Sequence, residues 1–200
     1  MKPIAAFALL SLLLSSAPVQ AAEPWEQAVA TAIGKPGAEM PGGVYRIGLP
    51  RSDLHVVLDG VTLKPALALG SWLACVPHGQ GQVMVMGDLV LTDTEVNPVM
   101  AKLIAGGVEI TALHNHLLRN TPHTMYMHIA GHGDPAQLAK VLHDALALSG
   151  TPLSAPPAAS PAAPETIDLD TAALDRILGH KGKIGGGVYA FGIPRAEAPR

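Results

Sequence analysis

Apolar and polar residues alternate along this chain with two periods, one typical of β-strands and the other of α-helices. Where every second residue is apolar the pattern predicts a strand, and spacings of three and four predict short amphipathic helices. The predicted strands are 44–49, 53–58, 61–69, 82–91, 108–118 and 124–130. The predicted helices are 25–33, 92–102, 134–148 and 174–178.

Short local signals mark several boundaries of these elements. Asp59-Gly60 separates two apolar runs and predicts a hairpin turn. Thr92 with Glu95 has the spacing of a capping box, and Asp134 before a proline is a favoured helix start. The resulting order β-α-β-β-α, preceded by a β meander, predicts an α+β fold with an antiparallel sheet and a ferredoxin-like segment.

The first residues predict export. Lys2 supplies a positive start, residues 4–14 form a short apolar run, and Val19-Gln20-Ala21 fits a signal-peptide cleavage site. We therefore expect residues 1–21 to be a signal peptide and the mature protein to be periplasmic or secreted. The apolar run is shorter than the roughly 20 residues that span a bilayer, so no stable membrane insertion is expected.

Composition narrows the classes of partner and site. The formal net charge is −3, with 16 acidic against 13 basic residues, and no basic patch is available to neutralise the phosphates of a nucleic acid. The single cysteine, Cys75, excludes an intrachain disulfide and a cysteine-rich zinc site. It lies in an apolar run and is expected to be a buried small hydrophobe. Any metal must therefore bind to histidine and oxygen ligands.

The chain divides at a linker and then repeats itself. Hydrophobic residues make up 48% of the sequence, which supports a packed domain over residues 22–150. Residues 151–165 contain five prolines and predict an extended linker. The sequence of 42–51 then returns at 186–195 with most residues identical. We expect 166–200 to be the start of a second, truncated copy of the unit, so that two chains could pair as a homodimer to replace the missing part.

Histidines gather in the two predicted strands 108–118 and 124–130. His114 and His116 share one face of the first strand, and the expected turn pairs His114 with His128 and His116 with Tyr126. Facing residues have Cβ atoms about 4.5–5.5 Å apart, close enough for imidazoles to share an ion. The pattern predicts that His114, His116 and His128 bind a transition metal such as zinc, copper, iron or manganese.

Other residues are candidates to support this site. Asp88 and Glu95 are carboxylates that could act as a further ligand or a general base. Tyr126, His132 and Arg51 are candidates for ligand binding, Arg51 through an anionic group. The same histidines also fit a polar network without a metal.

Four segments resemble one known family. They are Gly-Val-Tyr-Arg-Ile-Gly-Leu-Pro-Arg-Ser-Asp53, Lys64-Pro-Ala-Leu-Ala-Leu-Gly-Ser-Trp72, Met86-Gly-Asp-Leu-Val-Leu-Thr-Asp-Thr-Glu-Val-Asn-Pro98 and Thr111-Ala-Leu-His-Asn-His-Leu-Leu118. Together they are similar to the LppY/LpqO family of bacterial envelope proteins, over nearly all of residues 25–153. The resemblance implies an exported protein built from copies of this unit, without an established activity. The predicted leader carries no lipidation cysteine, which departs from an anchored form.

Two functions remain open at this stage. The first is an exported protein with a histidine-centred metal site that could support hydrolysis of an unknown small molecule or envelope component. The second is a non-catalytic envelope module that binds a ligand or protein through its sheet, with the histidines as a structural network. Metal content distinguishes them.

Overall fold

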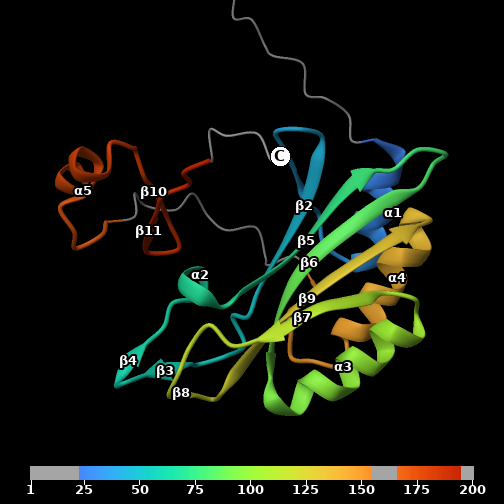
Figure 1. The fold of residues 1–200 in the computed structure, drawn as a ribbon, viewed down its shortest axis with the longest axis horizontal. Helices are drawn as coiled ribbons and strands as arrows, with labels where there is room; N and C mark the ends of the chain where they lie inside the picture. The colour runs from blue at the N-terminus through green and yellow to red at the C-terminus, as the bar shows by residue number, and fades with distance from the viewer. Residues whose placement is uncertain (1–22, 155–165, 195–200) are drawn as a thin grey trace, which may run out of the picture.

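The chain forms an α+β fold around one antiparallel sheet, as the pattern predicts (Figure 1). The computed structural model describes residues 23–154 and 166–194, so the predicted signal peptide and most of the predicted linker lie outside the described residues. Six strands form the main sheet in the order β1-β2-β5-β6-β9-β7. Their bounds are Ala38–Met40 (β1), Val44–Pro50 (β2), Gly70–Pro77 (β5), Val83–Thr92 (β6), Glu109–His114 (β7) and Thr124–Gly133 (β9).

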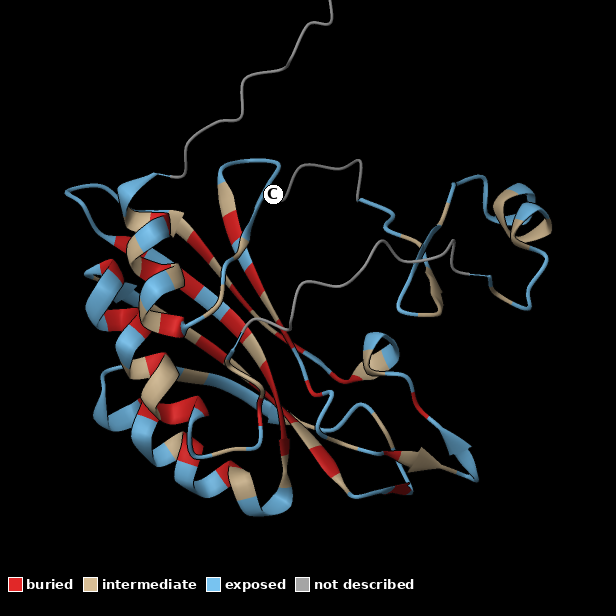
Figure 2. Cartoon of the chain, turned by 180° about the vertical axis from the view of Figure 1, so that it is seen from behind, coloured by how far each residue is buried: buried red, intermediate tan, exposed pale blue. Residues whose placement is uncertain are grey.

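Three helices cover one face of this sheet (Figures 1 and 2). They are α1 (Pro24–Ile33), α3 (Asp93–Ala105) and α4 (Pro135–Leu146). Alternate residues of β6, including Val85, Leu89 and Leu91, point toward these helices and are buried in the main core. Within the described residues, no helix is long and apolar enough to cross a membrane.

The predicted caps are present. Thr92 and Glu95 form the capping box that begins α3, and the Asp134 side chain accepts a hydrogen bond from the Gln137 amide at the start of α4. Strands β6, β9 and β7 with helices α3 and α4 form the predicted ferredoxin-like segment, in which β9 lies between β6 and β7. Cys75 is buried, as expected, and burial raises the pKa of its thiol to about 12.

The predicted hairpin 53–58/61–69 is wrong in length. Only β3 (Val57–Leu58) and β4 (Val61–Thr62) pair across the Asp59-Gly60 turn. Pro65 then begins a short helix, α2 (Pro65–Ala68), because its fixed φ suits the first helical turn. The apolar run after α2 forms the long strand β5, which the pattern did not predict as a strand.

The opposite face of the main sheet is covered only near one end. There β3 pairs with both β4 and β8 (Asn120–Thr121) in a small three-stranded sheet. A second apolar cluster lies beneath this sheet and joins it to the main sheet; its buried members are Val56, Leu63, Leu69, Val90 and Tyr126. The rest of this face, within the described residues, has no helix packed on it (Figure 1).

The C-terminal segment has the same order of elements as the N-terminal one. Helix α5 (Thr171–Leu178) precedes the hairpin of β10 (Lys183–Gly185) and β11 (Val188–Ala190), as α1 precedes β1 and β2. Both helices end at a glycine with positive φ, Gly34 and Gly179. Unlike α1, helix α5 has no buried residue among those described.

Candidate metal centre

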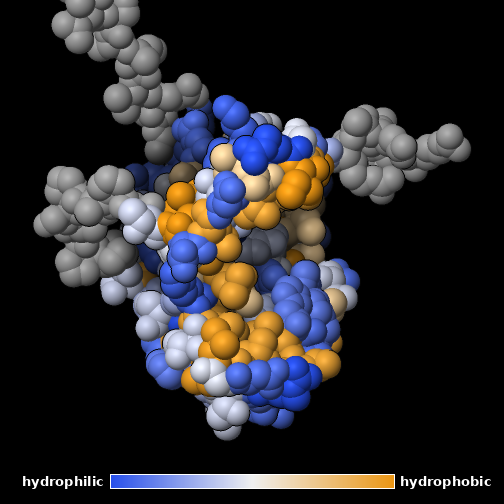
Figure 3. Space-filling view, turned by 90° about the vertical axis from the view of Figure 1, so that its left-hand side faces the viewer, coloured by the Kyte–Doolittle hydropathy of each residue, from blue (hydrophilic) through white to orange (hydrophobic). Residues whose placement is uncertain are grey.

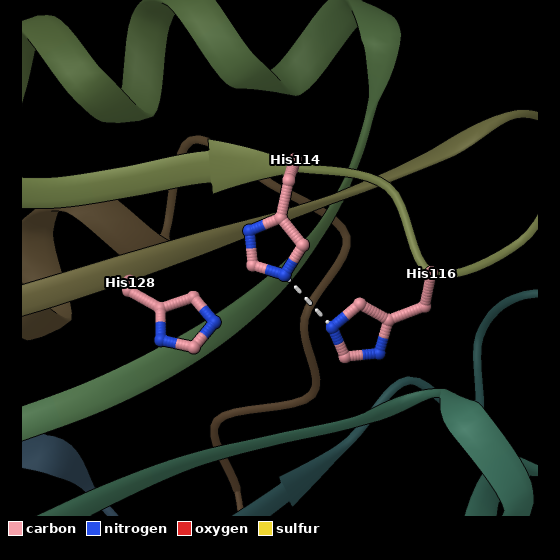
Figure 4. A group of neighbouring side chains, drawn as sticks. All are labelled: His114, His116 and His128. Carbon is pink, nitrogen blue, oxygen red and sulfur yellow. Dashed lines mark hydrogen bonds between the residues drawn. The ribbon is translucent and has the colours of Figure 1, made fainter.

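The three predicted histidines meet on the face of the sheet opposite the helices (Figure 4). His114 is the last residue of β7, and His128 lies on the neighbouring strand β9. His116 follows the end of β7, in the connection toward β8, and its ring turns back toward His114. One ligand atom from each residue can be chosen so that all three lie within 4.8 Å of one another.

The predicted pairing of these strands is wrong by two residues. His114 lies opposite Tyr126, and Ala112 lies opposite His128. The connection between the strands is longer than expected, because β7 ends at His114 and Asn120–Thr121 pair with β3 instead. A shift of two residues preserves the face of every side chain, so His114 and His128 remain diagonal neighbours on one face.

The imidazole rings are close to each other. The Nε2 atoms of His114 and His116 are 2.9 Å apart, so one ring donates a hydrogen bond to the other. The ring centroids of His114 and His128 are 4.9 Å apart, as are those of His114 and His116. His114 is thus the central member of the three-histidine cluster.

Tyr126 holds the outer histidine in place. The rings of His116 and Tyr126 are parallel within 3° with centroids 3.8 Å apart, and the Tyr126 hydroxyl donates a hydrogen bond of 2.8 Å to the Ala68 carbonyl. Burial raises the pKa of the Tyr126 hydroxyl, and the negative charge of Asp88 adds to this. A neutral, fixed tyrosine therefore supports a histidine that belongs to a loop.

Asp88 is the carboxylate that the structure brings to the cluster. It lies opposite His128 in the pairing of β6 with β9, and its Oδ1 is 3.9 Å from His128 Nε2. Both atoms are buried, and neither has a hydrogen-bond partner among the described residues. Buried polar atoms in proteins are nearly always paired. Among the described residues only Asn120 Oδ1 shares this condition with these two side-chain atoms.

Glu95 and Arg51 belong to a different cluster. The fully buried Arg51 donates to both Glu95 oxygens at 2.8 and 3.0 Å, to both Asp53 oxygens at 2.9 and 2.7 Å, and to the Val90 carbonyl at 2.7 Å. Glu95 also accepts hydrogen bonds from the amides of Thr92 and Gly150. The side chains of Arg51 and Glu95 thus connect the start of α3 to the end of β2 and to the loop after α4.

These contacts change the acidity of both groups. Burial acts to raise the pKa of Glu95, but the hydrogen bonds from Arg51, Gly150 and Thr92 outweigh it and leave the pKa below its usual value. For Arg51, burial acts to lower the pKa, and the carboxylates of Asp53 and Glu95 outweigh it. The ion pair is therefore held in its charged form.

His132 lies near the other end of β9, away from the three-histidine cluster. Its ring centroid is 6.1 Å from that of His78, which follows β5. This neighbour was not predicted from the sequence. His116 was predicted to face Tyr126 across two strands, and it does contact Tyr126, but by stacking on its ring from the connection after β7. The apolar run 71–76, with Gly79 and Gly81 after it, was the available signal for a hairpin that carries His78.

The donor set suits a transition metal. Imidazole nitrogens bind zinc, copper and iron, with zinc–nitrogen distances of about 2.0–2.1 Å. Ligand atoms around such an ion lie roughly 3.3 Å apart. The cluster spans 4.8 Å at most, so small side-chain rotations bring the three nitrogens to one ion. The unpaired Oδ1 of Asp88 lies 3.9 Å from the unpaired Nε2 of His128, beside the three-histidine cluster.

The comparisons with known proteins assign the chain to a family. No curated protein and no solved structure gives a significant match to it. A family model described as Domain of Unknown Function (DUF1259) matches residues 27–148, from α1 to just beyond α4. Because this match covers more than half of the sequence, the chain belongs to the DUF1259 family.

Proposed function

We propose that this protein is an exported envelope protein that binds one transition-metal ion through His114, His116 and His128, with Asp88 as a fourth ligand. The observation that carries the proposal is the convergence of three imidazoles within 4.8 Å beside a buried, unpaired carboxylate oxygen. The resemblance of the chain to LppY/LpqO proteins and the leader-like residues 1–21 support an envelope location.

The residues around the ion have separable tasks. His114 and His128 are positioned by strands, and His116 by its stacking on Tyr126. A metal held in this way supplies a Lewis acid that polarises a carbonyl or lowers the pKa of water. When Asp88 is not bound to the ion, its carboxylate would be a proton acceptor beside His128. A hydrolytic activity on a small molecule or an envelope component is the reaction class that fits these groups.

The rival function is a non-catalytic binding module in which the histidines form only a polar network. The hydrogen bond between His114 and His116 favours this alternative, because a network needs such bonds. The unpaired atoms of His128 and Asp88 argue against it, since a structural network would pair them. Neither proposed function includes a nucleic acid as a partner. Both include the pairing of two chains as a homodimer.

Elemental analysis tests the metal site directly. The full chain, expressed for export and purified without an affinity tag or chelator, should hold about one equivalent of a transition metal. The variant H114A/H116A should lose this equivalent while remaining folded by circular dichroism. A matched control is H55A/H143A, which removes two histidines outside the cluster and should keep the metal.

Acidification provides a second test of the same proposal. Only neutral imidazole binds a metal, and ordinary histidine titrates near pH 6.5. Zinc affinity measured by calorimetry should therefore fall as the pH is lowered from about 7.5 to 5.5. A folded parent protein that holds no metal and takes up neither zinc nor copper at any of these pH values would favour the binding module.

A further inference from the structure

The uncovered face of the sheet carries exposed methionines next to a second pair of histidines. Met84 and Met86 point to this face from β6, with 38% and 55% of their surface exposed. Figure 3 looks at the molecule from the left-hand side of Figure 1, opposite helices α1, α3 and α4, and shows apolar patches among polar ones. Strand positions that face water are usually polar, so two successive methionines in these positions call for an explanation.

Histidines lie on both sides of Met84. On the β5 side Val76 is directly opposite Met84, and His78, just after β5, is its diagonal neighbour. Met84 is opposite His132 in the pairing of β6 with β9, so the two side chains share this face with Cβ atoms about 4.5–5.5 Å apart. His78 continues the pairing of β5 with β6, because its amide donates to the Gln82 carbonyl at 2.8 Å. The ring centroids of His78 and His132 are 6.1 Å apart, which brings both imidazoles over the same strand.

Met86 has small neighbours on both sides. It lies opposite Ala74 on β5 and opposite Ala130 on β9. Methyl side chains leave its thioether uncovered, which agrees with its exposure of 55%. Methionine is also unbranched and flexible, so its sulfur can reach along the strand toward Met84.

From this placement we infer that Met84 and His132, with either His78 or Met86 as the third ligand, form a site for a soft monovalent metal ion, Cu(I). His78 and Met86 lie on opposite sides of Met84 along the strands, too far apart to bind the same ion together. Thioether sulfur is a soft ligand that selects Cu(I), and imidazole accepts the same ion. The site is separate from the three-histidine cluster. Since β9 rises about 3.3 Å per residue, His132 lies roughly 13 Å along the strand from His128. The inference does not depend on the proposed function.

The methyl groups of the methionines report on such a site. We would label the full-length exported protein with ¹³C at the methionine methyl groups and titrate it with Ag(I), a redox-inert substitute for Cu(I). The methyl signal of Met84 should shift with one equivalent, together with that of Met86 where Met86 is the third ligand. The signals of buried Met127 and of exposed Met40, at another place in the same sheet, should not. Single leucine variants assign the signals.

Competition with the Cu(I) chelator bicinchoninate gives the affinity. M84L/M86L and H78A/H132A should each lower it at least tenfold, whereas the matched control M40L should not change it. All of these side chains lie on the surface, so circular dichroism and zinc uptake at the three-histidine cluster should remain as in the parent.

Two results would overturn the inference. One is an Ag(I) titration that leaves the Met84 methyl signal in place. The other is a Cu(I) affinity that H114A/H116A removes but M84L/M86L leaves unchanged, which would place the copper at the three-histidine cluster. If instead zinc uptake fails while the methionine signals shift as expected, the proposed function is wrong and this inference stands.

Discussion

Two polar clusters contact strand β6, one through the Val90 carbonyl and the other through Asp88, and they differ in how their polar atoms are paired. Arg51 is fully buried, and its donors reach Asp53, Glu95 and the Val90 carbonyl. In the histidine cluster, Asp88 Oδ1 and His128 Nε2 are buried and lack partners among the described residues. The first cluster is complete within the protein, whereas the second is not.

This difference separates a structural role from a functional one. Burying a charge is costly unless other groups compensate it, so a buried arginine with two carboxylates and a carbonyl belongs to the architecture. Buried atoms that the protein leaves unpaired lower stability, and a fold tolerates them where a ligand or reaction needs them. Residues of both clusters were site candidates from the sequence, but only the hydrogen bonds that they make in the structure distinguish the two clusters.

The largest loss of stability is expected from a substitution that breaks the cluster around Arg51. R51M leaves two carboxylates without their cation, so the free energy of unfolding should fall by about 3–5 kcal/mol. Urea denaturation followed by circular dichroism measures this loss. In buffer that keeps the variant folded, its zinc affinity should match that of the parent, because Arg51 belongs to the other cluster.

A surface pair provides the matched control for that experiment. Arg119 donates to the Asp59 carboxylate, and both side chains are largely exposed. R119M should therefore change stability far less than R51M, since solvent screens an exposed pair. Equal effects of the two substitutions would show that Arg51 contributes no more than an ordinary surface charge.

A smaller effect is expected from the titration of Glu95. Its pKa in the folded protein is below the usual value, so it stabilises the fold above about pH 4.3, where the unfolded form is also ionised. That contribution disappears as the pH falls through the lower folded value. At pH 7 the free energy of unfolding of the parent should exceed that of E95Q by about 1–3 kcal/mol, and this difference should narrow below pH 4.3. A gap that stays constant down to pH 3 would contradict the lowered pKa.

The fold was predictable from the sequence where local chemistry decides the structure. The capping box at Thr92, the aspartate cap at Asp134 and the turn at Asp59-Gly60 depend on neighbouring residues only. Strand β5 was not predicted, because a continuous apolar run does not by itself indicate which neighbours it pairs with. The sequence therefore indicated the ferredoxin-like segment but not the full meander before it.

The candidate site was predictable in its members but not in its geometry. Alternation along the strands placed His114 and His128 on one face, and this part of the prediction held because the error in the pairing was two residues, which keeps the face. The position of His116 depends on a loop that leaves the sheet to pair with β3. Glu95 and Asp88 are both acidic residues near the end of β6, and only the position of Arg51 separates their roles.

The smallest effect on stability, and the most specific one, is expected from D88N. The substitution keeps the shape of the side chain but removes the negative charge of a carboxylate whose buried Oδ1 accepts no hydrogen bond from the described residues. Without metal, the free energy of unfolding should stay constant or rise by up to about 1 kcal/mol, because an amide costs less to bury than a carboxylate. Zinc affinity should fall about tenfold, since the ion loses an anionic ligand. D168N, at an exposed position before α5, should change neither quantity. A clear loss of stability in D88N would mean that Asp88 belongs to the architecture, as Arg51 does, and unchanged zinc affinity would leave the three histidines as the only protein ligands of the ion.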